Sequence, residues 1–343
     1  MSSSDALSVS RKGGEAATDR PLASMSLDLD NKWSYMKIHG DAGWQDYPSY
    51  LDVVVPRILD VLGRLEKRTT VFIVGLDATR EENIEPLKSI SASGHEIGNH
   101  SFHHEPWLHL YSREEIAAEL EQAEHAIESA TGRHPRGFRG PGFSVSPAVL
   151  DVLKERGYVY DASTFPTFLG PVARAYYFMT ARMSAEEREK RNKLFGKFSE
   201  GFRPLKPYVW QLQAGPLLEI PVTTIPYAKV PFHLSYILYL ASYSETVAHA
   251  YFVNALRMCR LSGVQPSLLL HPLDFLGGDD VPELKFFPAM GLSGAKKVQL
   301  TEALLQRYVS KFRVVTMQEH AEAALDAIRP TYRKLVPEVQ FAK

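Results

Sequence analysis

Cysteine is almost absent from this chain. Its 343 residues include a single one, Cys259. One thiol excludes a disulfide framework and argues against a cysteine metal site. Any bound metal must therefore be held by histidine and carboxylate side chains.

A dominant charge of one sign is also missing. Lys and Arg number 39 and Asp and Glu 40, which gives a net charge of −1. No global field recruits nucleic acid, so we expect no nucleic-acid partner. Residues 1–20 are rich in Ser, Gly and Ala and lack the apolar core of a secretory signal. We expect a disordered tail there and a cytoplasmic location by default.

Long apolar runs are lacking apart from residues 234–256, whose one carboxylate is Glu245. That length could span a bilayer, but serine, threonine, histidine and asparagine residues interrupt it. One or two buried helices are the favoured prediction. The alternative is that residues 231–261 rest on a membrane surface, which would place the protein at the inner membrane face.

What the chain does contain is an alternation of apolar, β-branched runs with amphipathic helical segments. The predicted strands are the residues just before His100 and 25–30, 69–75, 136–139, 158–161, 217–222, 266–271 and 312–316. The predicted helices are 48–67, 80–93, 112–130, 146–157 and 317–328. This order predicts an α/β fold, an irregular (β/α) barrel of about seven or eight parallel strands.

The chain is long enough for one such domain, which we place at residues 21–330. Residues 165–215 interrupt the alternation and are predicted to be an insertion that acts as a lid or substrate wall. Its charged segment, 184–197, fits a helix with a solvated face. Residues 331–343 are left as a C-terminal extension.

Histidines gather between residues 94 and 104. His100 and His104 are four residues apart. On a helical turn, that spacing puts both imidazoles on one face, within reach of one metal ion. The alternative is a solvent-exposed cluster or hydrogen-bonded core histidines.

Two carboxylates end the first predicted strand. Asp28 and Asp30 lie on the same side of it, which is costly unless they bind something. A solvated turn beginning at Asp30 is the alternative. The polar loop that follows, 31–47, includes Trp33, which fits either sugar stacking or a satellite aromatic cluster.

Chemically capable residues recur where predicted strands end, the rim at which barrel enzymes build their active sites. They are Asp28, Asp30, His100, His104, Arg139, Asp161 and His271. Two imidazoles, one carboxylate and an open position make a catalytic divalent-metal site, suited to zinc and also to Mn, Co, Ni or Fe.

The remaining residues complete a hydrolytic set. A second carboxylate can act as general base, and Arg139 can hold it ionised and oriented. His271 can protonate the leaving group, and the Gly140-Pro141-Gly142 turn can offer a backbone N–H to an oxyanion. Together they predict metal-assisted hydrolysis of an amide or ester.

With these residues in this order, the sequence resembles the polysaccharide deacetylase family, the NodB-homology carbohydrate esterases. The resemblance runs from Ser26 to about Glu319. It rests on Ser-Leu-Asp28-Leu-Asp30, His100-Ser-Phe-His-His104, Arg139-Gly-Pro-Gly-Phe143, Gly157-Tyr-Val-Tyr-Asp161 and Leu269-Leu-His271-Pro272.

The resemblance implies a role for each residue. Asp28 would be the base, oriented by Arg139, and His271 the acid. Asp30, His100 and His104 would bind the metal, with His103 as an alternative to His104. Gly142 would supply the oxyanion N–H, and Asp161 and Trp33 would serve the substrate side. The partner of His271 is left open between Asp274 and Asp161.

The expected activity is removal of the N-acetyl group from a sugar in a polysaccharide, oligosaccharide or lipid-linked precursor. Two departures stand out: Gly142 and Phe143 replace the family's frequent Tyr and Gly. A deformylase or allantoinase-like amidohydrolase is the first alternative. A non-catalytic glycan-binding pseudoenzyme is the second. The oligomeric state is left open.

Overall fold

The computed structural model describes residues 20–169 and 198–328. Among these, nine strands form one sheet in the order β6-β7-β5-β4-β3-β2-β1-β8, with β9 paired to the first half of β1. They are β1 Leu22–Asp28, β2 Thr70–Ile73, β3 Glu96–Asn99, β4 Gly137–Phe138, β5 Tyr160–Asp161, β6 Tyr208–Trp210, β7 Leu217–Glu219, β8 Ser267–Leu270 and β9 Arg313–Val315.

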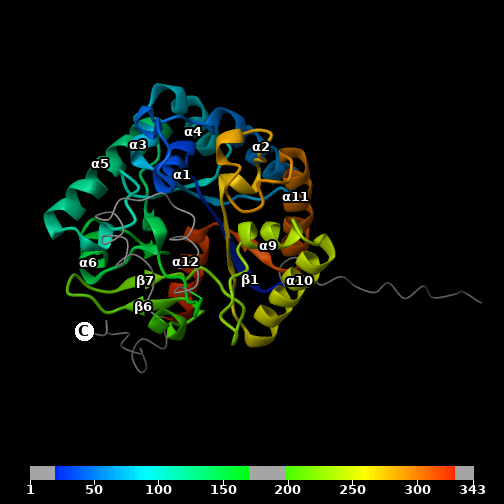
Figure 1. The fold of residues 1–343 in the computed structure, drawn as a ribbon. Helices are drawn as coiled ribbons and strands as arrows, with labels where there is room; N and C mark the ends of the chain where they lie inside the picture. The colour runs from blue at the N-terminus through cyan, green and yellow to red at the C-terminus, as the bar shows by residue number, and fades with distance from the viewer. Residues whose placement is uncertain (1–19, 170–197, 329–343) are drawn as a thin grey trace, which may run out of the picture.

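Every strand pairing is parallel except that of β6 with β7. The sheet curls into an open half-barrel, and helices surround it in Figure 1. The main helices are α1 Lys32–His39, α2 Leu51–Arg64, α3 Gly75–Ala78, α4 Glu81–Ala92, α5 Arg113–Thr131, α6 Pro147–Glu155, α9 Leu234–Ala241, α10 Glu245–Ser262, α11 Gly294–Lys311 and α12 Met317–Ile328. The predicted irregular (β/α) barrel is confirmed, with an added antiparallel edge strand.

Local signals explain most of these elements. Ser112 caps α5 with a capping box that includes Glu115, and α6 begins with Pro147 after the Ser146 cap. The expected polar loop at 31–47 instead contains α1. Asn31 accepts a hydrogen bond from the first helical N–H, and Gly40 ends the helix in a left-handed conformation.

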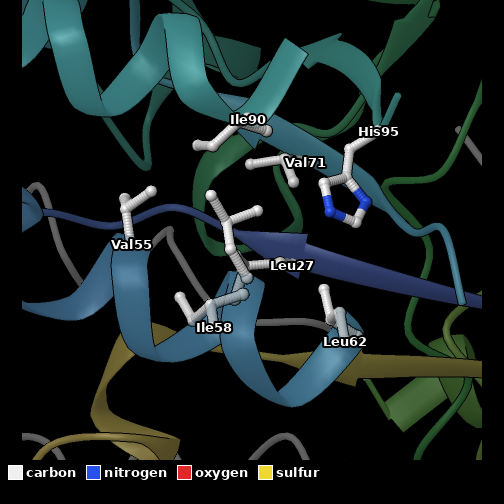
Figure 2. Close-up of a pocket in the computed structure, with 8 residues that line it drawn as sticks. Leu27, Val55, Ile58, Leu62, Val71, Ile90 and His95 are labelled. Atoms are coloured by element: carbon white, nitrogen blue, oxygen red, sulfur yellow. The ribbon is translucent and has the colours of Figure 1, made fainter. Parts of the chain in front are cut away.

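The core lies between the sheet and the helices. In Figure 2, Leu27 of β1 and Val71 of β2 face Ile58 of α2 and Ile90 of α4. His95 borders this group, and its Nδ1 accepts the Thr69 N–H at 3.1 Å. Burial lowers the pKa of His95 to about 4, so one histidine of the cluster is a neutral core residue.

The longest apolar run folds as α9 and α10, each with one buried face. In the described ranges 20–169 and 198–328, no helix has both the length and the apolarity to cross a bilayer. Contact of residues 231–261 with a membrane surface stays a prediction.

The structure describes part of the predicted insertion. Strand β6 falls inside the predicted insertion 165–215 but pairs with β7, so that part of the insertion belongs to the sheet. The predicted charged helix at 184–197, the tail up to residue 19 and the extension 331–343 lie outside the described residues.

Candidate active site

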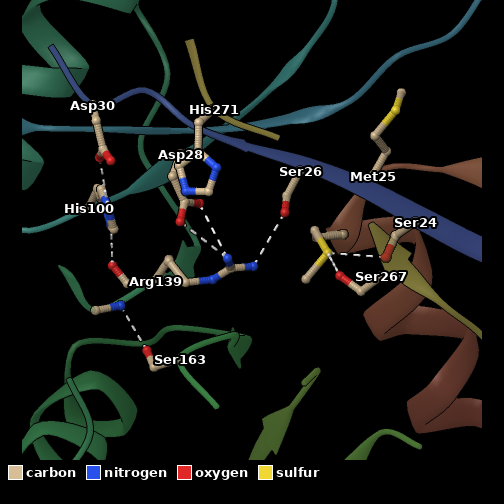
Figure 3. A network of polar contacts seen from close by, with 12 residues as sticks. Ser24, Met25, Ser26, Asp28, Asp30, His100, Arg139, Ser163, Ser267 and His271 are labelled. Carbon is tan, nitrogen blue, oxygen red and sulfur yellow. Dashed lines mark hydrogen bonds and ion pairs between the residues drawn. The ribbon is translucent and has the colours of Figure 1, made fainter. Parts of the chain in front are cut away.

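Six of the predicted residues converge at the carboxyl edge of the sheet, and Figure 3 labels all of them except His104. Asp28 ends β1, and Asp30 follows two residues later. His100 directly follows β3, Arg139 follows β4 and His271 follows β8. His104 is brought back to the same place by the loop after β3. Parallel pairing is what aligns these strand ends.

Three side chains form a group with the geometry of a metal site. The ligand atoms of Asp30, His100 and His104 all lie within 4.8 Å of one another. Asp30 Oδ1 is 3.0 Å from Nε2 of His104 and 3.4 Å from Nε2 of His100. This oxygen is buried and has no hydrogen-bond partner among the described residues. An orphaned carboxylate oxygen facing two imidazole nitrogens fits a divalent cation.

The electrostatics of Asp30 favour its charged form. Burial raises its pKa, but the close His104 and His100 rings lower it and outweigh burial. The net result is a pKa well below the usual value, so Asp30 is ionised at neutral pH. The two tyrosine hydroxyls nearby support it, with Tyr35 3.4 Å from Oδ2 and Tyr50 donating to the backbone carbonyl at 2.5 Å.

The two imidazoles meet by a route that differs from the predicted helical turn. Residues 100–104 form a loop in which Ser101 has φ 65° and His104 has φ 55°. These left-handed residues reverse the chain twice within one motif. The Asn99 side chain accepts the Ser101 N–H at 2.8 Å, and Ser101 Oγ accepts the His104 N–H at 3.1 Å. Hydrogen bonds therefore hold the strained loop in place.

Glu119 of α5 decides which histidine faces the site. Its carboxylate accepts the backbone N–H groups of Phe102 and His103 and contacts the His103 ring at 2.8 Å. His103 therefore points away, and His104 occupies the third position of the group. Burial raises the pKa of Glu119, but bonding to His103 lowers it below the usual value. Sequence analysis missed this residue, although a carboxylate between Ile116 and Leu120 on a buried face was a signal.

Arg139 contacts the candidate site through both its side chain and its backbone carbonyl. It is fully buried, and its guanidinium lies 3.3 Å from both oxygens of Asp28 and 3.3 Å from Ser26 Oγ (Figure 3). Its backbone carbonyl accepts a hydrogen bond from His100 Nδ1 at 2.6 Å. The donated Nδ1–H leaves the His100 Nε2 lone pair facing Asp30. One residue thus orients both the candidate base and a candidate ligand.

His271 follows β8, which pairs with the strand that Asp28 ends. Its backbone N–H donates to Asp274 at 2.8 Å, and its Nδ1 is 3.0 Å from Ser235 Oγ of α9. Of the two candidate partners, Asp274 is therefore the neighbour. Ser235 is a second residue that sequence analysis missed. It lies 36 positions from His271 in the chain, and no local pattern links the two.

Asp161 is placed differently from the prediction. It is fully buried and accepts two hydrogen bonds from Ser163, whose hydroxyl in turn accepts the Gly140 N–H at 2.8 Å. Burial and the charge of Asp161 hold the pKa of neighbouring Glu219 well above its usual value. Asp161 thus supports the turn after Arg139. Its predicted role toward substrate stays a prediction.

Trp33 is also placed behind the site. Its side chain is 1 % exposed and stands edge-on to His104, with 6.4 Å between ring centroids. Its indole N–H donates to Asp77 Oδ1 at 2.9 Å. Burial raises the pKa of Asp77 to about 7, while bonds from Asn31 and Trp33 oppose that rise. Trp33 packs behind a candidate ligand, and its contact with substrate stays a prediction.

Gly142 lies in the 3₁₀ turn Pro141–Phe143 and is exposed. Its φ of 57° is left-handed, and Phe143 follows with φ 60°. An L side chain at residue 142 would be strained and would also meet Pro106 at 3.1 Å. Its role as an oxyanion donor stays a prediction.

Comparisons with known proteins match part of this chain to one family. Residues 41–160 match the family model described as polysaccharide deacetylase. Chitin deacetylase 1 of Saccharomyces cerevisiae is 34% identical over 143 residues, which cover 40% of this chain and 44% of that protein. A peptidoglycan-N-acetylglucosamine deacetylase of Bacillus cereus is 31% identical over 142 residues, covering 40% of this chain and 60% of that protein. The matched part thus spans less than two thirds of either relative.

The fold has a counterpart over nearly its whole length. A crystal structure from Mycobacterium smegmatis, described as a candidate polysaccharide deacetylase, superposes with a TM-score of 0.58 at 18% identity. The superposition covers 98% of this chain and 97% of the other. At that identity the likeness shows the fold alone. Residues 41–160 are thus similar to the polysaccharide deacetylase family, and the relatives match the chain over less than half of its length.

Proposed function

We propose that this protein is a metal-dependent N-deacetylase of sugars. The observation that carries the proposal is the Asp30–His100–His104 group, which lies at the same sheet edge as an Arg139-held Asp28 and His271. The match of residues 41–160 to the polysaccharide deacetylase model supports the deacetylase class. The metal and the kind of sugar are the parts that we add.

A divalent cation, Zn²⁺ first among the candidates, would be held by Asp30, His100 and His104. When bound, such a cation acts as a Lewis acid that acidifies water and polarises an amide carbonyl. Two imidazoles and one carboxylate leave the open position that catalysis needs. Co²⁺, Ni²⁺, Mn²⁺ and Fe²⁺ suit the same donor set.

The protein residues handle the protons. Asp28 takes the proton of the attacking water, and the Arg139 guanidinium, 3.3 Å from both of its oxygens, holds it in place. His271 gives a proton to the departing amine, so that acetate and a free amino sugar are released. The exposed Gly142 N–H donates to the developing oxyanion.

The substrate class follows from the relatives and the fold. The curated relatives are named for chitin and peptidoglycan, which are polymers containing N-acetylated sugars. We therefore propose an N-acetylated glycan or glycan precursor as substrate, with a lipid-linked sugar included. A glycan-binding protein without turnover has no need of both a base and an acid, and this chain has both.

The test is product analysis on a panel of substrates by metal-loaded protein. The panel holds an N-acetylglucosamine oligomer, a prenyl-phosphate-linked N-acetylated sugar, their N-formyl analogues and allantoin. We expect acetate and free amine in equal amounts from an N-acetylated sugar. Formate release alone, or turnover of allantoin alone, would assign the site to a deformylase or an allantoinase-like enzyme. Glycan binding with no product would favour the pseudoenzyme.

A further inference from the structure

The candidate acid, His271, is held by a helix from outside the motifs that define the site. Helix α9 begins at Leu234, inside the apolar segment between β7 and β8. Its second residue, Ser235, places its hydroxyl 3.0 Å from His271 Nδ1. The imidazole therefore has a hydroxyl partner on its Nδ1 side.

Asp274 sets the direction of this hydrogen bond. Its side chain is 1 % exposed, and it accepts the His271 backbone N–H at 2.8 Å. Burial raises the pKa of Asp274, and the charge of His271 and a hydrogen bond from Ser235 oppose that rise. The net pKa of Asp274 stays raised. In its ionised form the carboxylate only accepts, and the single hydroxyl proton of Ser235 then goes to Asp274. Ser235 Oγ must then accept from His271 Nδ1–H.

The titratable groups around Ser235, His271 and Asp274 are compatible with this direction of the hydrogen bonds. The His233 ring meets His271 edge-on with 6.0 Å between centroids, and burial lowers its pKa to about 3, so it is neutral. Lys297 of α11 bonds to the Leu273 carbonyl at 2.7 Å and faces Asp274; burial lowers its pKa to about 8. Asp28 ends β1, the strand that pairs with β8 directly before His271.

We propose that Ser235 is a positioning residue for His271, relaying a hydrogen bond from Nδ1–H to the buried Asp274 carboxylate. The relay keeps the proton of the neutral ring on Nδ1 and leaves Nε2 toward the reacting groups. It also gives the protonated ring an acceptor for its second N–H. Through Ser235, helix α9 thereby contributes a side chain to the candidate active site. The acid role of His271 rests on the proposed function, but the relay itself does not.

The direct test is the protonation state of His271 in the full-length, Zn²⁺-loaded protein. Imidazole ¹⁵N spectra would be recorded against pH for wild type, Ser235→Ala and Ser235→Thr, with His271→Gln assigning the signal. Ser242→Ala is the matched control, since Ser242 is the C-cap of the same helix and its hydroxyl donates to the Tyr239 carbonyl.

In wild type we expect the neutral ring to carry its proton on Nδ1. In Ser235→Ala we expect a mixture of tautomers and a lower titration midpoint, because the charged ring loses an acceptor. Threonine should restore both, and Ser242→Ala should match wild type. A wild-type ring protonated on Nε2, or an unchanged ring in Ser235→Ala, would overturn the relay.

Turnover gives the second readout. In Ser235→Ala, kcat for acetate release should fall about tenfold or more, a part of the ~10²–10⁴ that a general acid contributes. KM should change little, and the alkaline limb of the pH profile should move to lower pH. If wild type shows the expected spectra but hydrolyses no N-acyl sugar, the proposed function fails while the relay stands.

Discussion

Replacing Asp28 with asparagine is expected to lower kcat/KM for acetate release by about 10²–10⁴-fold, the usual contribution of a general base. Asp28 is 4% exposed and has Arg139 Nη1 3.3 Å from both of its oxygens. Asparagine keeps the shape and one acceptor oxygen for Arg139, but it cannot take a proton from water. The loss should therefore appear in turnover, while the fold and the metal group are retained.

Two control measurements distinguish the loss of a general base from loss of the metal or a general effect of removing a carboxylate. Asp28→Asn should still bind one metal ion, because Asp28 is outside the Asp30–His100–His104 group. Asp52→Asn, an exposed carboxylate in the first turn of α2, should keep wild-type turnover. If Asp28→Asn retains more than about a tenth of wild-type kcat/KM, another group is the base.

Replacing Arg139 with methionine is expected to lower the free energy of unfolding by about 3–5 kcal/mol, the cost of breaking a buried ion pair by removing one partner. Arg139 is 0% exposed, and no other cation is hydrogen-bonded to Asp28 among the described residues. The guanidinium also lies 4.9 Å from the centre of the Phe72 ring. Methionine fills similar space but leaves the Asp28 charge buried without its partner.

Denaturant unfolding of the metal-free protein measures this effect, with the slope compared between variants. Arg136→Met is the matched control: Arg136 lies three residues earlier and is exposed, so its removal should cost less than about 0.5 kcal/mol. Equal stabilities for the two variants would show that the Asp28–Arg139 pair contributes nothing to folding.

The sequence predicted the order of the strands and helices and placed the candidate site at the carboxyl ends of the strands. Period-2 and period-3.6 patterns are local, and parallel strands align their carboxyl ends, so Asp28, His100, Arg139 and His271 could be brought together from spacing alone. Helix α11 was missed, although Leu300 and Leu304 lie on its buried face. The antiparallel strand β6 was missed because it is only three residues long.

What could not be read from the sequence is how side chains meet across elements. The left-handed turns at Ser101 and His104 replace the helical turn that the spacing suggested. The contacts of Glu119 with the histidine loop and of Ser235 with His271 join residues far apart in the chain. Asp161 lies in its predicted strand and Trp33 lies in α1 rather than in a loop, and the fold buries both. Tertiary packing, which no local pattern encodes, decides these positions.

The measurement that tests the central claim most directly is acetate release from an N-acetylated glycan as Zn²⁺ is titrated into the metal-free protein. The account predicts that activity rises in proportion to bound metal and saturates at one ion per chain. It further predicts that His104→Ala, which lacks a member of the candidate metal group, neither binds the ion tightly nor releases acetate. Equal acetate release by metal-free and metal-loaded protein would contradict the account, as would stoichiometric binding that brings no turnover of any N-acetylated sugar.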